Sequence, residues 1–331
     1  MKILYVDSLK AKHAQSNITG LLSAFQLYGE VDVFDYRTLA KISSNEKMNK
    51  ALVKTCLKTN YDFIFLGKCE SIFGETVRII KEQTKSFVVS FLGDFYWEPC
   101  PFKVEQNKYA DLSLFSYYEK EVISKYNSKN SGFWTDGSNA GVDYYMGLEK
   151  IHDVVFLGSN HLTINNYLEN YSFRYELMKE IDSNFDLHVY GNGWDGFKNQ
   201  HSWVQNKDKT TAVNQAKITI GVSAVVSFLY LSYPRVFQSM ACGTLHITQY
   251  VPGLELLFKN HEDIVWFNTI EEAKVLLRYY LENDNMRERV ALNGREKALQ
   301  HSYVNRVKGI IDCTIKDDLF GYLGVNLPSL A

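Results

Sequence analysis

Residues 232–258 read SYPRVFQSMACGTLHITQYVPGLELLF. Ser232 is a helix-capping residue, Pro234 suits the first position of a helix, and Gly243 suits the left-handed residue that ends one. The apolar residues between them recur at helical spacing, so the pattern predicts a short helix with one docked face. Residues 244–248 are an apolar run that predicts a buried strand. The stretch is therefore typical of a helix–strand unit in an α/β sheet.

A second helix is predicted directly after this strand. Pro252 and Gly253 turn the chain, and the helix is expected to begin near Leu254 with Glu255 in its first turn. Helix N-termini carry unpaired N–H groups and a partial positive charge, and Arg235 adds a full charge on a planar fork. The spacing predicts a site for a phosphate or diphosphate. The alternative is an ordinary helix–strand–helix segment of a doubly wound sheet.

The composition is that of a globular protein with two domains. The chain has 331 residues, of which 46% are hydrophobic and 22% are charged. Its formal net charge of -2 gives no general attraction to polyanions, so no nucleic-acid partner is expected.

The cysteines and the hydrophobic runs indicate the cellular compartment. Five cysteines are scattered without a C-x-x-C pair, which indicates reduced thiols and neither a disulfide framework nor a zinc site; no metal site is predicted. The apolar run at residues 1–7 is too brief for a signal peptide, and the run at 218–231 falls short of the roughly 20 residues that span a bilayer. We expect a cytoplasmic protein without a transmembrane segment.

Apolar strand-like runs alternate with amphipathic helical runs along the chain. The predicted strands are 3–7, 31–36, 61–67, 86–94, 112–117 and 132–135 in the first half, and 153–158, 187–190, 218–222, 244–248 and 264–267 in the second. This alternation predicts an α/β protein whose parallel sheets are covered on both faces. Glycines at 135–150 interrupt the alternation and predict a linker. We expect Rossmann-like domains at 1–140 and 150–301, and a final helix and tail at 302–331.

Candidate catalytic residues of the first domain lie beyond the carboxyl ends of predicted strands, where such sheets place their functional loops. The long loop 8–20 carries His13, and the fourth strand ends at Asp94 among aromatic residues. Aromatic surroundings raise the pKa of a carboxyl group toward working pH, so Asp94 is a candidate base. The alternatives are an aspartate that caps the next turn and a surface loop without a catalytic role.

Candidate binding residues of the second domain also lie at strand ends or in the helix that follows one. They are Gly158, Ser159, Arg174, Tyr190, Gly191, Asn192, Gly193 and Trp194, together with Ser232, Arg235, Pro252, Gly253 and Leu254. Glycines let the backbone approach a ligand closely, and Tyr190 or Trp194 offers a ring that can stack on a base. The P-loop pattern and the dinucleotide fingerprint are both absent, which argues against an NTPase and against NAD.

Several short motifs resemble one enzyme family. The run 235–243, Gly-Leu-Glu-x-x-Phe at 253–258 and Tyr-Tyr-Leu-x-Asn at 279–283 resemble the nucleotide-sugar-binding half of the CgeB-like group-1 glycosyltransferases, which are GT4-like. The closing segment His-Ser-Tyr-x-x-Arg at 301–306 is similar as well, so the resemblance covers 153–306, and the first domain in outline. It implies the GT-B architecture, in which two Rossmann-like domains face each other across a cleft and the last helix crosses back to the first domain.

The resemblance also implies an activity. The protein would be a metal-independent, hexosyltransferase-type glycosyltransferase that takes a UDP- or GDP-type sugar donor and needs no other cofactor. Arg235, with Arg174, would stabilise the diphosphate leaving group in place of a divalent ion, and no Asp-x-Asp metal clamp is present. The first domain would bind the acceptor, by default a glycan, with Asp94 or His13 nearest the reacting centre. Family analogy favours retention of the anomeric configuration.

The chain departs from the resembling enzymes at two positions. Many retaining GT-B enzymes carry two glutamates separated by seven residues, and Tyr230 and Gln238 occupy those places here. Gln238 can accept a hydrogen bond from a ribose hydroxyl without the charge of a glutamate, while Glu255 remains for the ribose or the sugar. Two alternatives stay open: a nucleotide-sugar-binding protein without turnover and a sugar-nucleotide epimerase. Glycosylation of DNA lacks support from charge, and the sequence leaves the donor sugar, the base, the acceptor and the oligomeric state open.

Overall fold

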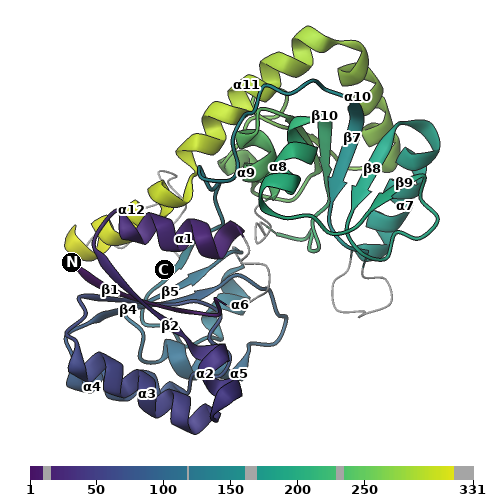
Figure 1. The fold of residues 1–331 in the computed structure, drawn as a ribbon. Coiled ribbons are helices and arrows are strands. Elements are labelled where there is room, and N and C mark those ends of the chain that lie inside the picture. The colour runs from purple at the N-terminus through teal and green to yellow at the C-terminus, as the bar shows by residue number, and fades with distance from the viewer. Residues whose placement is uncertain (10–15, 118, 161–169, 229–234, 317–331) are drawn as a thin grey trace. The chain divides into compact units, whose positions relative to one another are not determined.

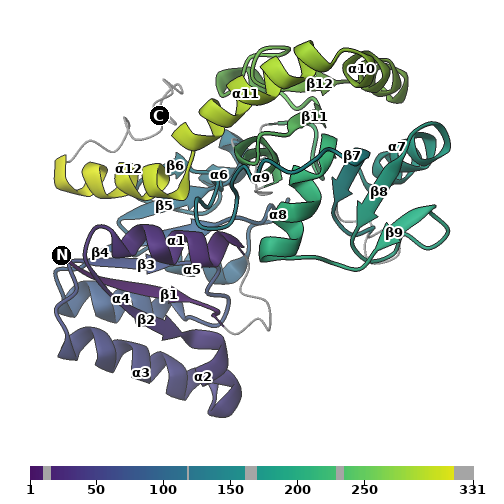
Figure 2. The ribbon, with the colours of Figure 1, turned by 45° about the horizontal axis from the view of Figure 1, so that its top comes forward.

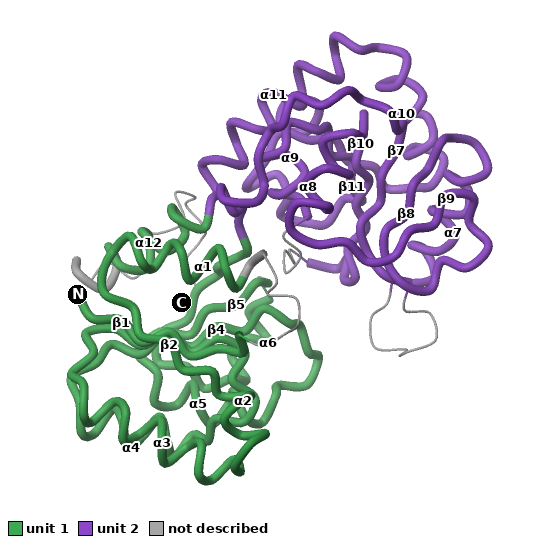
Figure 3. The backbone as a smooth tube through the Cα atoms, viewed as in Figure 1, with its two compact units in different colours: residues 1–136, 303–331 green, residues 137–302 purple. Residues whose placement is uncertain are grey.

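The computed structural model describes residues 1–9, 16–117, 119–160, 170–228 and 235–316 of the chain (Figure 1). The chain divides into two compact units, one of residues 1–136 and 303–331 and one of residues 137–302 (Figure 3). Each unit is built on a parallel sheet of six strands. The predicted fold class, an α/β protein with two parallel sheets, is confirmed.

The first unit alternates strands with helices. Its strands are β1 (Lys2–Asp7), β2 (Glu30–Asp35), β3 (Phe63–Leu66), β4 (Phe87–Leu92), β5 (Leu112–Phe115) and β6 (Ser131–Phe133), in the spatial order β2-β1-β3-β4-β5-β6. Its helices are α1 (Ser16–Gln26), α2 (Tyr36–Ile42), α3 (Asn45–Lys58), α4 (Gly74–Gln83), α5 (Pro101–Asn107), α6 (Lys120–Ser124) and α12 (Tyr303–Lys316). The strand order reverses between β1 and β3, which is the switch point of this sheet.

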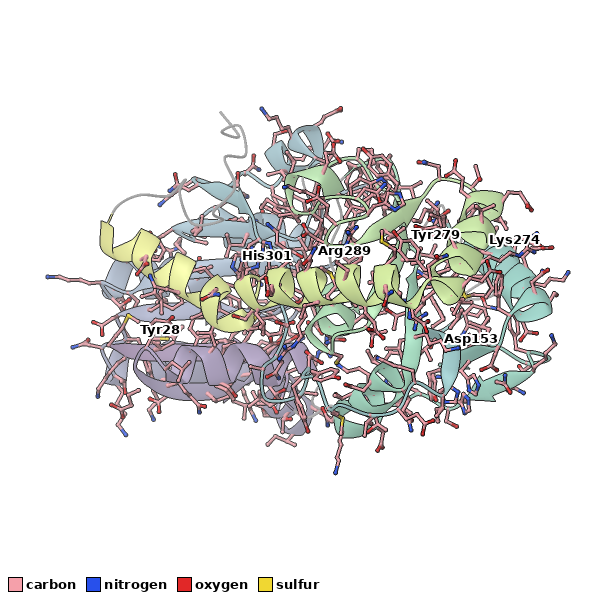
Figure 4. All side chains as sticks on the ribbon, turned by 90° about the horizontal axis from the view of Figure 1, so that it is seen from above. Tyr28, Asp153, Lys274, Tyr279, Arg289 and His301 are labelled. Carbon is pink, nitrogen blue, oxygen red and sulfur yellow. The ribbon has the colours of Figure 1, made fainter. Side chains whose placement is uncertain are left out.

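Side chains of β1 alternate between two cores, as the period of a strand requires. Ile3 and Tyr5 belong to the core that also contains residues of α1 and α12, whereas Leu4 and Val6 belong to the core of α3 and α4 (Figure 2). Tyr28, labelled in Figure 4, donates its hydroxyl to a backbone carbonyl oxygen of α12 at 3.4 Å. Helix α12 is the last element of the described chain, yet it belongs to the first unit and completes the covering of its sheet.

The second unit repeats this organisation. Its strands are β7 (His152–Leu157), β8 (Leu187–Tyr190), β9 (Asn199–His201), β10 (Ala216–Gly221), β11 (Leu245–Gln249) and β12 (Val265–Phe267), in the spatial order β12-β11-β10-β7-β8-β9. Its helices are α7 (Tyr171–Asn184), α8 (Asn206–Asn214), α9 (Arg235–Ala241), α10 (Ile270–Glu282) and α11 (Asp284–Gln300), with a 3-10 turn η1 (Leu254–Leu256). Strand order reverses between β7 and β10, so the switch point of this sheet lies there.

The central strand β7 is buried on both faces. Val154 and Phe156 pack in a core with residues of α7 and α10, whereas Val155 and Leu157 pack on the opposite side with α8 and Cys242. A strand with two covered faces needs a continuous apolar run, which is why this strand is readable in the sequence.

All eleven predicted strands are present with small shifts of their ends, and Gly243 ends α9 in the left-handed region with φ 69°. The predicted helix at Leu254 is wrong, because residues 254–256 form a single 3-10 turn. Leu254, Leu257 and Phe258 are all buried, so one tight turn satisfies the apolar pattern that suggested a helix. Strand β9 and helices α2 and α5 were not predicted.

The segment 137–150, predicted as part of a linker, is fixed within the second unit. Asp143 is buried; it accepts hydrogen bonds from the Asn139 backbone N–H at 2.9 Å and from Lys209 Nζ at 2.8 Å. The chain passes between the units at residues 136–137 and again at 302–303. An isolated β-bridge between Ser138 and Ser302 joins these two crossings within the second unit.

The thiols and the helices bear on two further predictions. Cys56, Cys69, Cys100 and Cys242 are free and buried, in agreement with the expected reduced thiols. Burial raises the pKa of Cys56 and of Cys242 to about 12, so both stay protonated at neutral pH. Among the helices of the described ranges, none is long and apolar enough to cross a membrane.

Candidate functional site

The carboxyl edge of the second sheet places Arg235 beside the end of β7. Arg235 is the first residue of α9, and its Nη1 donates to the Leu157 carbonyl oxygen at 2.6 Å. Its guanidinium carbon lies 5.5 Å from the centre of the Phe156 ring. A Cβ atom at Gly158 would lie 2.7 Å from Nη1, so the glycine is what lets the guanidinium reach the strand end. Gly158 and Arg235, both candidate binding residues, are therefore adjacent because the glycine leaves room for the guanidinium.

Arg174 lies at the same switch point and also approaches the Phe156 ring. The side chain is 3% exposed; its Nη1 donates to the Ser159 carbonyl oxygen and its Nη2 to the Val222 carbonyl oxygen, each at 3.3 Å. Its guanidinium carbon is 5.9 Å from the centre of the Phe156 ring. Two permanent positive charges thus lie where β7 and β10 end, held by backbone carbonyl oxygens and an aromatic ring.

The two glycine-containing loops lie against each other at this edge. The Asn160 N–H donates to the Asn192 carbonyl oxygen at 2.8 Å, and the Asn192 N–H donates to Ser159 Oγ at 3.2 Å. Gly191 has φ 153°, and a Cβ atom there would lie 2.4 Å from the Gly158 carbonyl oxygen. The structure therefore brings the loops after β7 and β8 together, because only a glycine allows this approach.

Trp194 does not have the role proposed for it from the sequence. The side chain is 1% exposed, its Nε1–H donates to the Gly158 carbonyl oxygen at 2.7 Å, and its ring packs edge-on against Phe156. A base cannot stack on a ring enclosed in the core. Trp194 instead stabilises the loop after β7 through its hydrogen bond to Gly158. Tyr190 is half-buried with its ring stacked on His201 at 4.3 Å, and its contact with a base stays a prediction.

The turn after β11 differs from the predicted helix terminus. Gly253 adopts φ 97°, Pro252 is exposed and Leu254 is buried. Glu255 is exposed and its Oε2 accepts from the Gly253 N–H at 3.1 Å and from Tyr250 Oη at 3.2 Å. A turn of three residues has only a small macrodipole, and the Glu255 carboxylate already accepts a hydrogen bond from the Gly253 N–H. The positive charge of the site consequently comes from the arginines and not from paired helix ends.

Gln238 lies in α9, where all residues from 236 to 241 are buried, and its side chain is 4% exposed. A glutamate at this position would carry its charge into the interior, whereas an amide avoids most of that cost. The predicted contact with a ribose stays a prediction. Tyr230 and Ser232 lie outside the described residues, as does His13.

Two groups at this edge were not singled out in the sequence. His246, in β11, is 2% exposed; its Nδ1 lies 2.9 Å from Thr219 Oγ1, and burial together with the charge of Arg235 lowers its pKa to about 3. It is therefore neutral at physiological pH. Asn170 donates through Nδ2 to the Ser223 carbonyl oxygen at 2.8 Å, beyond the end of β10. A histidine inside an apolar strand is typical of a core residue, so no sequence pattern singled out His246.

The carboxyl edge of the first sheet carries Asp94. Lys68 Nζ forms an ion pair with Asp94 Oδ2 at 2.6 Å, and the two side chains are 40% and 48% exposed. Phe95 is buried and packs edge-on against Trp97 and Tyr117. The aromatic residues after β4 thus pack with one another and leave Asp94 half-buried, so the enclosed carboxyl group expected from the sequence is not found.

A second carboxyl group at this edge is enclosed instead. Asp136 follows β6, is buried, and accepts from Tyr303 Oη at 3.1 Å. Burial raises the pKa of Asp136 to about 7, and the charge of Asp94 adds to the increase, against the opposing effects of Tyr303 and Arg306. Asp136 therefore titrates near neutrality. Its position in the predicted linker concealed it, because enclosure depends on Tyr303, which is 167 residues away along the chain.

Comparisons with known proteins agree with this architecture. A family model described as "Glycosyl transferase-like" matches residues 174–312, which include both arginines. The sucrose-phosphate synthase of Thermosynechococcus elongatus is similar at a TM-score of 0.67 and 12% identity over 96% of this chain and 100% of that one. Anabaena HepE in complex with UDP and glucose is similar at 0.66 and 11% over 96% and 100%, and an alpha-glucosyltransferase in complex with UDP at 0.65 and 11% over 95% and 100%. No curated protein sequence matches significantly. These likenesses show the GT-B fold.

Proposed function

We propose that the protein is a glycosyltransferase that takes a hexose from a UDP-sugar bound at the carboxyl edge of the second sheet. The observation that carries the proposal is the pair Arg174 and Arg235 at the switch point between β7 and β10. Ligands of doubly wound sheets bind beyond the strand ends at that point. A diphosphate is the ligand that two guanidinium groups there suit best. The matched family segment and the UDP held by HepE and by the alpha-glucosyltransferase support the same nucleotide.

Arg235 and Arg174 would act on the leaving group. Breaking the bond between sugar and phosphate leaves a diphosphate with additional negative charge, and guanidinium groups fixed before the reaction stabilise that charge without reorganisation. The transfer would not need a divalent ion. The first unit would bind the acceptor, proposed to be a glycan, and Asp94 and Asp136 are two of the carboxyl groups that follow its strand ends. Retention of configuration is proposed from the resemblance alone.

A nucleotide-sugar-binding protein without turnover is the second candidate. Two observations favour it: Glu255 is bonded within its own turn, and Gln238 stands buried where a charged residue is usual in the resembling enzymes. Incubation with a panel of UDP-sugars and candidate glycans separates the candidates. Free UDP is expected for a transferase, binding without free UDP for a binding protein, and a changed donor without free UDP for an epimerase.

Arg235→Ala is expected to weaken UDP binding about 10- to 150-fold while uridine binding changes less than about threefold. The reason is that the lost charge-assisted bond, worth about 1.5–3 kcal/mol, is made to phosphate and not to the nucleoside. Isothermal titration with both ligands measures this. Arg289→Ala is the matched control, because Arg289 is an exposed residue of α11 in the same unit, labelled in Figure 4. Equal loss of UDP and uridine affinity in Arg235→Ala would contradict the assignment.

Release of UDP is expected to continue at an unchanged rate after EDTA treatment. The charge on the leaving group would be held by guanidinium groups, which chelation does not remove. The rate is measured before and after dialysis against EDTA, and again after addition of Mg²⁺ or Mn²⁺. Loss of turnover with recovery in Mg²⁺ or Mn²⁺ would show that a metal ion takes part in the chemistry.

A further inference from the structure

Two histidines and an aspartate gather near the amino edge of the second sheet, and a third histidine, His201, reaches them from the carboxyl end of β9. His152 is the first residue of β7, Asp186 directly precedes β8, His188 is the second residue of β8, and His201 ends β9. One nitrogen each of His152 and His188 and one carboxylate oxygen of Asp186 all lie within 4.8 Å of one another. The cluster therefore joins three neighbouring strands.

His188 is the centre of the cluster. Its Nε2 lies 3.2 Å from Asp186 Oδ1, and its Nδ1 lies 2.9 Å from His201 Nε2. The ring centres of His152 and His188 are 3.7 Å apart, and the rings of His188 and His201 are stacked at 5.1 Å. The Nε2 atom of His188 thus faces Asp186, while the Nδ1 atom is held by His201. Histidines that bind metals are usually oriented in this way by an outer partner.

We infer that His152, Asp186 and His188 form a binding site for a divalent transition metal of the Zn²⁺ type, oriented by His201. Two imidazoles and a carboxylate suit Zn²⁺, with Co²⁺ or Ni²⁺ as substitutes, and leave a position for water. Ligand atoms around tetrahedral zinc lie roughly 3.3 Å apart, so separations of up to 4.8 Å must close by up to about 1.5 Å. The Asp186 side chain is 42% exposed and has room to make that adjustment.

The neighbouring carboxylate is already engaged. Asp153, labelled in Figure 4, accepts from Lys217 Nζ at 2.7 Å, which leaves Asp186 as the carboxylate of the cluster. The metal would hold β8 and the short edge strand β9 to β7, because its ligands and His201 come from all three. Strand β7 places its first residue, His152, roughly 17 Å from its last, Leu157, beside which Arg235 lies. The three proposed ligands thus lie away from the proposed donor site. His201 stacks on Tyr190 and its carbonyl oxygen accepts from the Gly191 N–H, so independence from the transferase activity is tested with His188 and Asp186 and not with His201.

The test is a calorimetric titration of the untagged, full-length protein with ZnCl₂ after removal of metals by chelation. One equivalent is expected to bind, with at least about 100-fold loss of affinity in His188→Ala and about 10- to 100-fold loss in His201→Ala. His261→Asn is the control, because His261 is exposed in the same unit outside the cluster, and its left-handed φ of 61° suits asparagine. At 100 times the dissociation constant, zinc should raise the melting temperature of the second unit by about 5–10 °C.

Asp186→Asn provides a second route if His188→Ala does not fold, since Asp186 is exposed and the amide keeps its shape. Co²⁺ absorption of the unaltered protein should report nitrogen and oxygen ligands, and this spectrum should be lost in Asp186→Asn. UDP affinity should be the same with and without zinc, so this experiment and the Arg235→Ala experiment succeed or fail separately. Absence of zinc binding, or weak binding of several ions that His188→Ala and Asp186→Asn leave unchanged, would overturn the inference.

Discussion

Lys209→Met is expected to destabilise the second unit by about 3–5 kcal/mol, because it leaves a buried carboxylate without its cation. Lys209 Nζ lies 2.8 Å from Asp143 Oδ1; the Asp143 side chain is fully buried and that of Lys209 is 11% exposed. Methionine keeps the length and apolar stem of the lysine, so the loss reports on the charge. The free energy of unfolding is measured by guanidinium denaturation, with the slope checked for constancy.

Two further variants test the reason for this loss. Asp143→Asn combined with Lys209→Met removes the isolated charge and is expected to recover part of the stability. Lys259→Met breaks the exposed ion pair of Lys259 with Glu262, whose side chains are 74% and 62% exposed, and should cost less than about 1 kcal/mol. If Lys209→Met cost no more than Lys259→Met, the Asp143 pair would not anchor the segment 137–150.

Asp136→Asn is expected to stabilise the first unit at pH 8 by up to about 4 kcal/mol, with little effect near pH 4. Burial raises the pKa of Asp136 to about 7 in the folded chain. Between about pH 4 and 7 the folded state therefore holds a proton that the unfolded state has released, so stability falls as pH rises through this window. Each unit of pKa difference is worth 1.36 kcal/mol, and three such units give the upper limit. Asparagine stays neutral and removes the dependence.

Thermal or denaturant unfolding at several pH values between 4 and 8 measures this difference. Tyr303→Phe is an informative companion, because the hydroxyl of Tyr303 donates to Asp136 and lowers its pKa. Without that hydroxyl the pKa should rise further and the loss of stability should extend to higher pH. Parallel pH profiles for the unaltered protein and Asp136→Asn would contradict the assigned enclosure. The pH profile of UDP release in Asp136→Asn also tests whether Asp136 acts as an acid or base near neutrality.

The strands were predictable because burial of both sheet faces imposes apolar runs. Eleven strands were predicted in this way, although the edge strand β2 has no buried residue. Gly243 shows equally local control, since its left-handed conformation ends α9. Strand β9, with the sequence Asn-Gln-His, was missed because it has no apolar run of its own and is a strand only through pairing with β8. The turn at Leu254 was misread because buried leucines satisfy a helix and a single 3-10 turn alike.

The sequence by itself determined the two-domain α/β class and the candidate residues Gly158, Gly191 and Arg235, because backbone conformation and residue chemistry are local properties. Only the tertiary structure decided that Trp194 is enclosed and that Asp136 is buried while Asp94 is not. It also decided that histidines from three separate strands meet in one cluster. Enclosure and proximity depend on side chains that are distant in sequence, and the sequence pattern around one residue does not contain them.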